Sequence, residues 1–127
     1  MPYKFYNPNP SNIRVGDCVV RALSKALQKS WEDIYVSLCA EGLLFHDMPS
    51  SDYVWGMYLK KNGFQQKMVE SICPDCTTVQ RFADSHPDGV YVVKTQSHVI
   101  CIRDGGCWWD SWNSGDEIVL YFWQKEE

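Results

Sequence analysis

The sequence has no hydrophobic run long enough to cross a bilayer, and its first eight residues lack the apolar core of a signal peptide. Its formal net charge is -4, and its 12 lysine and arginine residues are scattered along the chain. No basic face of the kind that binds nucleic acid is therefore expected. Together these absences predict an intracellular, cytoplasmic protein that binds neither a membrane nor nucleic acid.

The chain also lacks internal repeats, low-complexity tracts and linkers. With 127 residues it is long enough to bury one core. A hydrophobic share of 45% and an aromatic share of 14% are typical of globular chains. We therefore expect a single domain covering residues 1–127.

Metal-binding patterns are few. Cys73 and Cys76 form one CxxC, but no second CxxC or close histidine pair completes a zinc site. Because the N-terminal residues do not resemble an export signal, free thiols are expected rather than disulfides, with Cys39 and Cys101 in the core. We expect neither a metal nor an organic cofactor, and a zinc or dithiol module built on the CxxC remains an alternative.

Apolar residues at helical spacing predict helices in the first two thirds of the chain. The first predicted helix covers 17–28, and its apolar stripe is formed by Val19, Leu23, Ala26 and Leu27. A second helix is capped by Ser30, has Asp33 in the capping-box position, and ends at Gly42. Its inward-facing residues are predicted to be Trp31, Ile34, Tyr35 and Leu38.

A third helix is expected from about 51 to 62, and a short fourth one from about 77 to 86. Residues 64–72 are expected to form a short strand, and residues 1–15 an irregular arm over the core. Four short, β-branched and aromatic segments then predict an antiparallel meander: 90–94, 97–103, 107–110 and 118–123. Helices first and strands second indicate an α+β fold, with N-terminal helices packed on a C-terminal antiparallel sheet.

Cys18 is the leading candidate nucleophile. It follows a Gly16-Asp17 turn and opens the first helix. The N-terminus of a helix favours a thiolate over a thiol, because its unpaired N–H groups carry partial positive charge. A buried core thiol is the alternative interpretation.

His98 and Asp110 are the candidate partners of this thiol. His98 begins one predicted strand and Asp110 ends the next, and the Asp104-Gly105-Gly106 turn between them places both at the same end of a hairpin. Taken alone, each residue is more simply structural. Thiol hydrolysis needs an imidazole beside the sulfur and a third group that orients the imidazole, and these two residues meet both needs.

Substrate binding requires donors for the developing oxyanion and walls around the substrate. The backbone N–H of Cys18 and the side-chain amide of Asn12 are the predicted oxyanion donors. Asp17, Trp109 and Trp112 are further candidates for lining the substrate site, because they flank the nucleophile or Asp110.

The order of Asn12, Cys18 at a helix start, His98 on a strand and Asp110 on the following strand resembles papain-like cysteine peptidases in their short bacterial and phage form. It is similar to peptidase domains that trim bacteriocin leaders, although those carry Gln where this chain has Asn12 and Gly where it has Val19. Cys18 followed by Arg21-Ala22 also resembles ovarian-tumour-type deubiquitinases, although Val99 replaces the aromatic residue usual after their histidine.

These resemblances imply a papain-like fold and a cysteine peptidase or amide hydrolase that forms a thioester acyl-enzyme. Its partner would be a peptide or protein substrate. A catalytically silent module that binds peptides or proteins, and a deubiquitinase-like isopeptidase, are the alternatives within the same fold.

Overall fold

The computed structural model describes residues 2–69 and 76–126, which form four helices and a six-stranded mixed sheet. The predicted α+β class is confirmed. In chain order the elements are β1 (Tyr3–Phe5), α1 (Cys18–Leu27), α2 (Trp31–Phe45), α3 (Asp52–Lys61), β2 (Phe64–Met68), α4 (Val79–Ser85), β3 (Tyr91–Lys94), β4 (Val99–Arg103), β5 (Cys107–Asp110) and β6 (Tyr121–Lys125).

The strand order in the sheet is β1-β5-β4-β3-β6-β2. Strands β3, β4 and β5 form the predicted antiparallel meander. The prediction that the last segment continues this meander is wrong, because β6 pairs with β3 on the opposite side from β4. The prediction of a wholly irregular arm is also wrong. Three of its residues form β1, which pairs in parallel with β5 and so covers that edge of the sheet.

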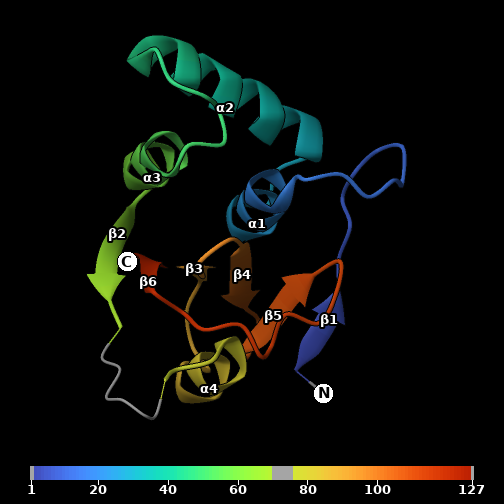
Figure 1. Cartoon of the computed structure of the whole chain (residues 1–127), viewed down its shortest axis with the longest axis vertical. Helices are drawn as coiled ribbons and strands as arrows, with labels where there is room; N and C mark the ends of the chain where they lie inside the picture. The colour runs from blue at the N-terminus through green and yellow to red at the C-terminus, as the bar shows by residue number, and fades with distance from the viewer. Residues whose placement is uncertain (1, 70–75, 127) are drawn as a thin grey trace.

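The sheet separates two layers of helices (Figure 1). Helix α1 lies on one face, with α2 and α3 beyond it, and α4 covers the other face. Strand residues alternate between the two cores with the period of two that a pleated sheet imposes. On β3, for example, Val92 packs toward α1 while Tyr91 and Val93 pack toward α4.

The predicted helix starts are confirmed by their capping contacts. The side chains of Ser30, Ser51 and Thr78 each accept a hydrogen bond from a backbone N–H three residues ahead. The prediction that Gly42 ends the second helix is wrong, since α2 continues to Phe45. Gly42 is required for a different reason: a Cβ there would lie 2.7 Å from the backbone oxygen of Asp47.

Two predictions about α2 are wrong. Tyr35 and Cys39 were expected to be buried, but both are exposed. The helix packs on α1 and α3 along a narrow stripe centred on Ile34 and Leu38, so its flanks face solvent. Cys101, in contrast, is fully buried in β4, as predicted.

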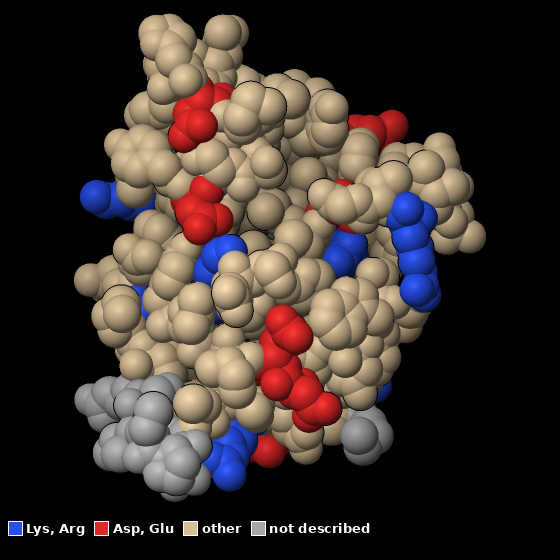
Figure 2. All heavy atoms as spheres, viewed as in Figure 1, with Lys and Arg blue, Asp and Glu red and all other residues tan. Residues whose placement is uncertain are grey.

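The predicted strand at 64–72 is present as β2, which runs from Phe64 to Met68. Positions 70–72 of the prediction lie outside the described residues. On the face drawn in Figure 2, acidic and basic side chains are interspersed rather than gathered by sign. Within residues 2–69 and 76–126, no helix combines the length and the apolar character that a bilayer span requires.

Candidate functional site

Cys18 is the first residue of α1 and is half-buried. Asp17 occupies the N-cap position of this helix, but its side chain makes no capping hydrogen bond. Its two carboxylate oxygens instead accept from Arg21 Nη1 at 2.6 Å and from Trp31 Nε1 at 2.8 Å. The Asp17 side chain therefore does not cap the N–H groups in the first turn of α1, the turn that Cys18 begins.

The β4–β5 hairpin brings His98 and Asp110 together, as the sequence predicted. His98 immediately precedes β4 and Asp110 ends β5. His98 Nε2 lies 2.6 Å from Asp110 Oδ2, and both side chains are buried. Because Nε2 faces the carboxylate, the other ring nitrogen, Nδ1, is the one left for a second partner.

Cys18 is the candidate for that second partner, because it lines the same pocket as His98 and each of the two groups is among the causes that shift the other's pKa. Burial raises the pKa of the Cys18 thiol, but His98, together with the Val99 backbone and the charge of Arg21, outweighs this effect and the net pKa is lowered. Burial lowers the pKa of His98, yet the hydrogen bonds and charges of Asp110 and Cys18 raise it to about 9. Both shifts favour a thiolate facing an imidazolium.

Asp110 stays ionised despite its burial. Burial raises its pKa, but hydrogen bonds from His98 and Ser114 and the charge of Arg21 lower it overall. The Ser114 hydroxyl donates to Oδ2 at 2.6 Å, and the backbone N–H of Ser111 donates to Oδ1 at 2.8 Å. The carboxylate is thus held on both oxygens, which fixes the orientation it imposes on the imidazole.

Arg21 is an important residue of this site that sequence reasoning missed. Its guanidinium lies between two carboxylates: Nη2 is 2.9 Å from Asp110 Oδ1 and Nη1 is 2.6 Å from Asp17 Oδ1. Its side chain is only 6% exposed. The four-residue spacing of Asp17 and Arg21 on a helix was a usable signal, because residues so spaced lie on one face.

The N-terminal strand supports Asp110 through the backbone. The backbone carbonyl oxygen of Asp110 accepts a hydrogen bond from the Tyr6 backbone N–H at 2.8 Å and another from the Tyr3 hydroxyl at 3.1 Å. These bonds join the start of the chain to a residue more than one hundred positions later. The arm therefore helps to fix the end of β5 from which the Asp110 side chain projects.

The remaining predicted substrate-site residues divide into two groups. Trp112 lies at the site, with its ring centroid 4.8 Å from that of His98. Trp109 faces elsewhere: Lys25 Nζ lies over its ring, and its indole N–H bonds to the Arg103 carbonyl. Asn12 is exposed on the arm, and the structure does not bring it to the sulfur.

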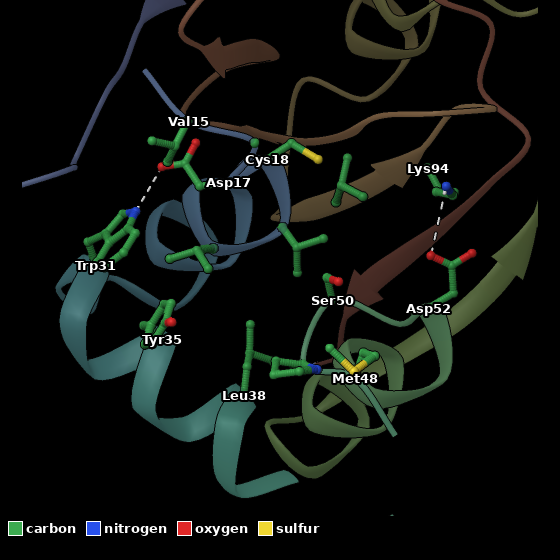
Figure 3. Close-up of a pocket in the computed structure, with 15 residues that line it drawn as sticks. Val15, Asp17, Cys18, Trp31, Tyr35, Leu38, Met48, Ser50, Asp52 and Lys94 are labelled. Carbon is green, nitrogen blue, oxygen red and sulfur yellow. Dashed lines mark hydrogen bonds and ion pairs between the residues drawn. The ribbon is translucent and has the colours of Figure 1, made fainter. Parts of the chain in front are cut away.

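Two pockets meet at Cys18. The first, called the His98 pocket, has a volume of about 440 Å³ and includes Arg14, Arg21, His98, Ser111 and Trp112 in its walls. The second, called the apolar pocket, has a volume of about 510 Å³ (Figure 3). Its walls come from the first turns of α1, from α2, from the 48–52 segment and from Lys94 and Val99. Both volumes lie within the range of small-molecule sites, about 300–1,000 Å³.

Within the described residues, no group of three or more His, Cys, Asp or Glu side chains is arranged to hold a metal ion. Cys73 lies outside those residues, so the CxxC motif is only partly described. Comparison with known proteins found no match among family models, curated proteins or solved structures.

Proposed function

We propose that this protein is a cysteine-dependent amide hydrolase of papain-like type, acting on peptide or protein substrates with Cys18 as nucleophile. The observation that carries the proposal is the 2.6 Å contact between His98 Nε2 and Asp110 Oδ2, which leaves Nδ1 for the Cys18 sulfur. A thiol, an imidazole and an orienting carboxylate in this relation are the groups that thiol acyl transfer uses.

In the first half of the reaction, the Cys18 thiolate attacks the carbonyl carbon of an amide and a C–S bond forms. The electron pair of the carbonyl moves onto its oxygen. His98 Nδ1 then gives its proton to the amide nitrogen as the C–N bond breaks, so an amine leaves and a thioester remains. Asp110 keeps its negative charge throughout and stabilises the imidazolium form of His98.

In the second half, neutral His98 takes a proton from a water molecule that attacks the thioester carbonyl. The C–S bond breaks, the carboxylic acid leaves and loses its remaining proton to solvent, and Cys18 returns to a thiolate beside protonated His98. No group outside the protein is needed for this cycle except the amide and water.

The first turn of α1 supplies a donor for the oxyanion. The backbone N–H of Cys18 has no intrahelical acceptor, because it lies in the first turn, and the Asp17 side chain does not cap it. An oxyanion formed on a carbonyl attached to the sulfur would lie close to this N–H, where the helix dipole also stabilises negative charge.

The proposal is tested by the rate at which iodoacetamide modifies each cysteine at pH 6, followed by mass spectrometry of peptides. We expect Cys18 to react much faster than Cys39, the exposed thiol that serves as an internal reference. His98→Ala should remove most of this difference. Equal rates at Cys18 and Cys39 in the wild-type protein would contradict the proposal.

Turnover needs a separate measurement, because a silent binding module could retain a reactive thiol. A mixture of unmodified peptides is incubated with the wild-type protein and with Cys18→Ala, and new N-termini are identified. Cleavage that is lost in Cys18→Ala supports hydrolysis, with a loss of at least about 100-fold expected for His98→Ala as well. No cleavage by the wild-type protein, despite a fast Cys18, would favour the binding module.

A further inference from the structure

We propose that the outer face of α2 binds the same face of a second copy of this chain, with the two helices antiparallel. The outer face of α2 is formed by six exposed residues that carry no charge: Tyr35, Val36, Cys39, Ala40, Leu43 and Leu44. A dimer of this kind does not depend on the function proposed above. The spacing, the charge and the area of the face each favour a second copy as its partner.

Helix α2 is the outermost helix of its layer (Figure 1). Its inner side packs on α1 and α3 through Ile34 and Leu38, which are buried. Its outer side presents Val36, Leu43 and Leu44, whose exposed fractions are 66%, 76% and 62%. Single exposed leucines are ordinary on a protein surface, but a contiguous apolar patch of several hundred Å² marks an interaction surface.

The spacing of residues on the outer face suits another helix as the partner. Val36 and Leu43 are seven residues apart, so they lie on one line along α2, with Cys39 and Ala40 between them. Small side chains in the middle of the face and larger ones toward both ends let two helices approach closely where they cross. In an antiparallel pair centred between Cys39 and Ala40, Val36 of each copy meets Leu43 of the other. The face is thus complementary to itself, as a two-fold dimer requires.

The charged residues of α2 decide the orientation of the pair. Glu32 and Asp33 are exposed in the first turn, whereas Glu41, the one other charged residue of the helix, is buried and pairs with Lys61. A parallel pair would bring four carboxylates together. An antiparallel pair separates the two acidic ends by roughly 20 Å and sets the helix dipoles in opposite directions, which is favourable. Because α2 contains no lysine or arginine, it lacks the basic side with which amphipathic helices bind anionic membranes.

The area of the outer face predicts a weak dimer. Tyr35, Val36, Leu43 and Leu44 together expose roughly 500 Å² in each copy, so a symmetric pair would bury roughly 1,000 Å², near the lower limit for a specific interface. Interfaces of this size are typical of transient complexes. The fraction of dimer should therefore depend on protein concentration in the micromolar range.

Sedimentation velocity of the full chain, from about 5 to about 500 µM, tests the dimer. The wild-type protein should shift from monomer to dimer over this range. Leu43→Glu places a charge in the middle of the face and should raise the dissociation constant at least about tenfold. Leu120→Glu makes the same change at an exposed leucine outside α2 and should leave the constant unaltered. A wild-type protein that stays monomeric, with or without binding to phosphatidylcholine vesicles, would overturn the proposal, as would an equal loss in both variants.

Cross-linking tests the antiparallel arrangement. In a Cys39→Ser background, the Val36→Cys and Leu43→Cys proteins are mixed, oxidised with copper phenanthroline, and analysed by mass spectrometry of the linked peptides. The mixed 36–43 disulfide should form at least about fivefold faster than the 36–36 and 43–43 disulfides, because only the mixed pair lies within disulfide distance. Faster formation of the 36–36 and 43–43 disulfides would indicate a parallel pair, and no linkage would indicate another surface. Either result would overturn the proposal.

Cys39 provides a second measurement on the unsubstituted chain. Its rate of modification by iodoacetamide should fall several-fold as the protein concentration rises through the dissociation constant, because the second copy covers the thiol. Well below that concentration Cys39 stays exposed, as its use as a reference thiol requires. In Leu43→Glu the rate should not change with concentration. A constant rate in a wild-type protein that does dimerise would place the interface elsewhere and overturn the proposal.

Discussion

Arg21 and Asp110 form a buried ion pair in which Nη2 lies 2.9 Å from Oδ1, although 89 positions separate the two residues in the chain. This pair joins the helix that holds Cys18 to the strand that ends beside His98. The sulfur and the imidazole are therefore placed relative to each other by a contact that involves neither of them.

Arg21→Met should be among the most destabilising changes in the protein. It leaves the Asp17 and Asp110 carboxylates buried without their shared cation, which typically costs about 3–5 kcal/mol of unfolding free energy. Chemical denaturation measures the change. Arg81→Met on the exposed side of α4 is the matched control, and a loss within about 0.5 kcal/mol is expected there. Similar losses in both variants would contradict the role assigned to Arg21.

The titration of His98 should depend on the charge of Asp110. NMR of the ring should show a midpoint near 9 in the wild-type protein, because the pKa of His98 is raised to about 9. Asp110→Asn removes the negative charge, so the midpoint should fall toward the ordinary value of 6.5. Ser114→Ala removes one hydrogen bond to the carboxylate but keeps its charge, so it should move the midpoint less. An unchanged midpoint in Asp110→Asn would be inconsistent with the observed pairing.

The pH dependence of stability should change when Cys18 is removed. Under the proposed function, Cys18 is a thiolate in the folded protein, so the thiolate–imidazolium pair holds one proton between pH 6.5 and 9, and the unfolded thiol with a neutral imidazole also holds one. The pair therefore contributes little to the change of the unfolding free energy with pH in this range.

In Cys18→Ala, His98 still has its pKa raised by Asp110, so the folded state holds a proton that the unfolded state lacks. This stabilisation is fully present below pH 6.5 and is lost as the pH rises through the folded pKa of His98. Denaturation midpoints from pH 6 to 9 should therefore fall more steeply in Cys18→Ala than in the wild type. Parallel curves would argue against a thiolate in the folded protein.

Gly42→Ala should be destabilising although alanine is the better helix former. The new Cβ would lie 2.7 Å from the Asp47 backbone oxygen, and overpacking of this kind costs about 1–3 kcal/mol. Gly16→Ala is the control, because a Cβ there would meet no described atom within 4 Å. Thermal denaturation of both variants checks this, and an equal or higher midpoint for Gly42→Ala would show that the loop after α2 yields easily.

The groups at the centre of the site were predictable from local signals. A cysteine after a Gly-Asp turn, and a hairpin whose turn lies between His98 and Asp110, can be read from residue types and counting alone. Each signal spans fewer than fifteen residues. The geometry agrees with them because helix starts and tight hairpins are determined mainly by the residues within them.

The parts that were missed depend on contacts between distant segments. That β6 lies beside β3, and that β1 lies beside β5, follows from packing of the whole sheet, which no local pattern encodes. Arg21 becomes part of the site only when α1 docks on the hairpin. Asn12 was chosen for its distance from Cys18 in sequence, yet the arm takes a left-handed turn there and keeps it exposed.

The pairing of the first strand with the fifth has a consequence for synthesis. During translation, the thiol emerges long before the imidazole and its carboxylate, and β1 can find its partner strand only once residue 110 is available. In a nascent chain the sulfur is thus without its imidazole partner until residues 98–110 have been synthesised. Hydrolytic competence, under the function proposed above, would arise only after residue 110 has been synthesised and the hairpin has docked on α1.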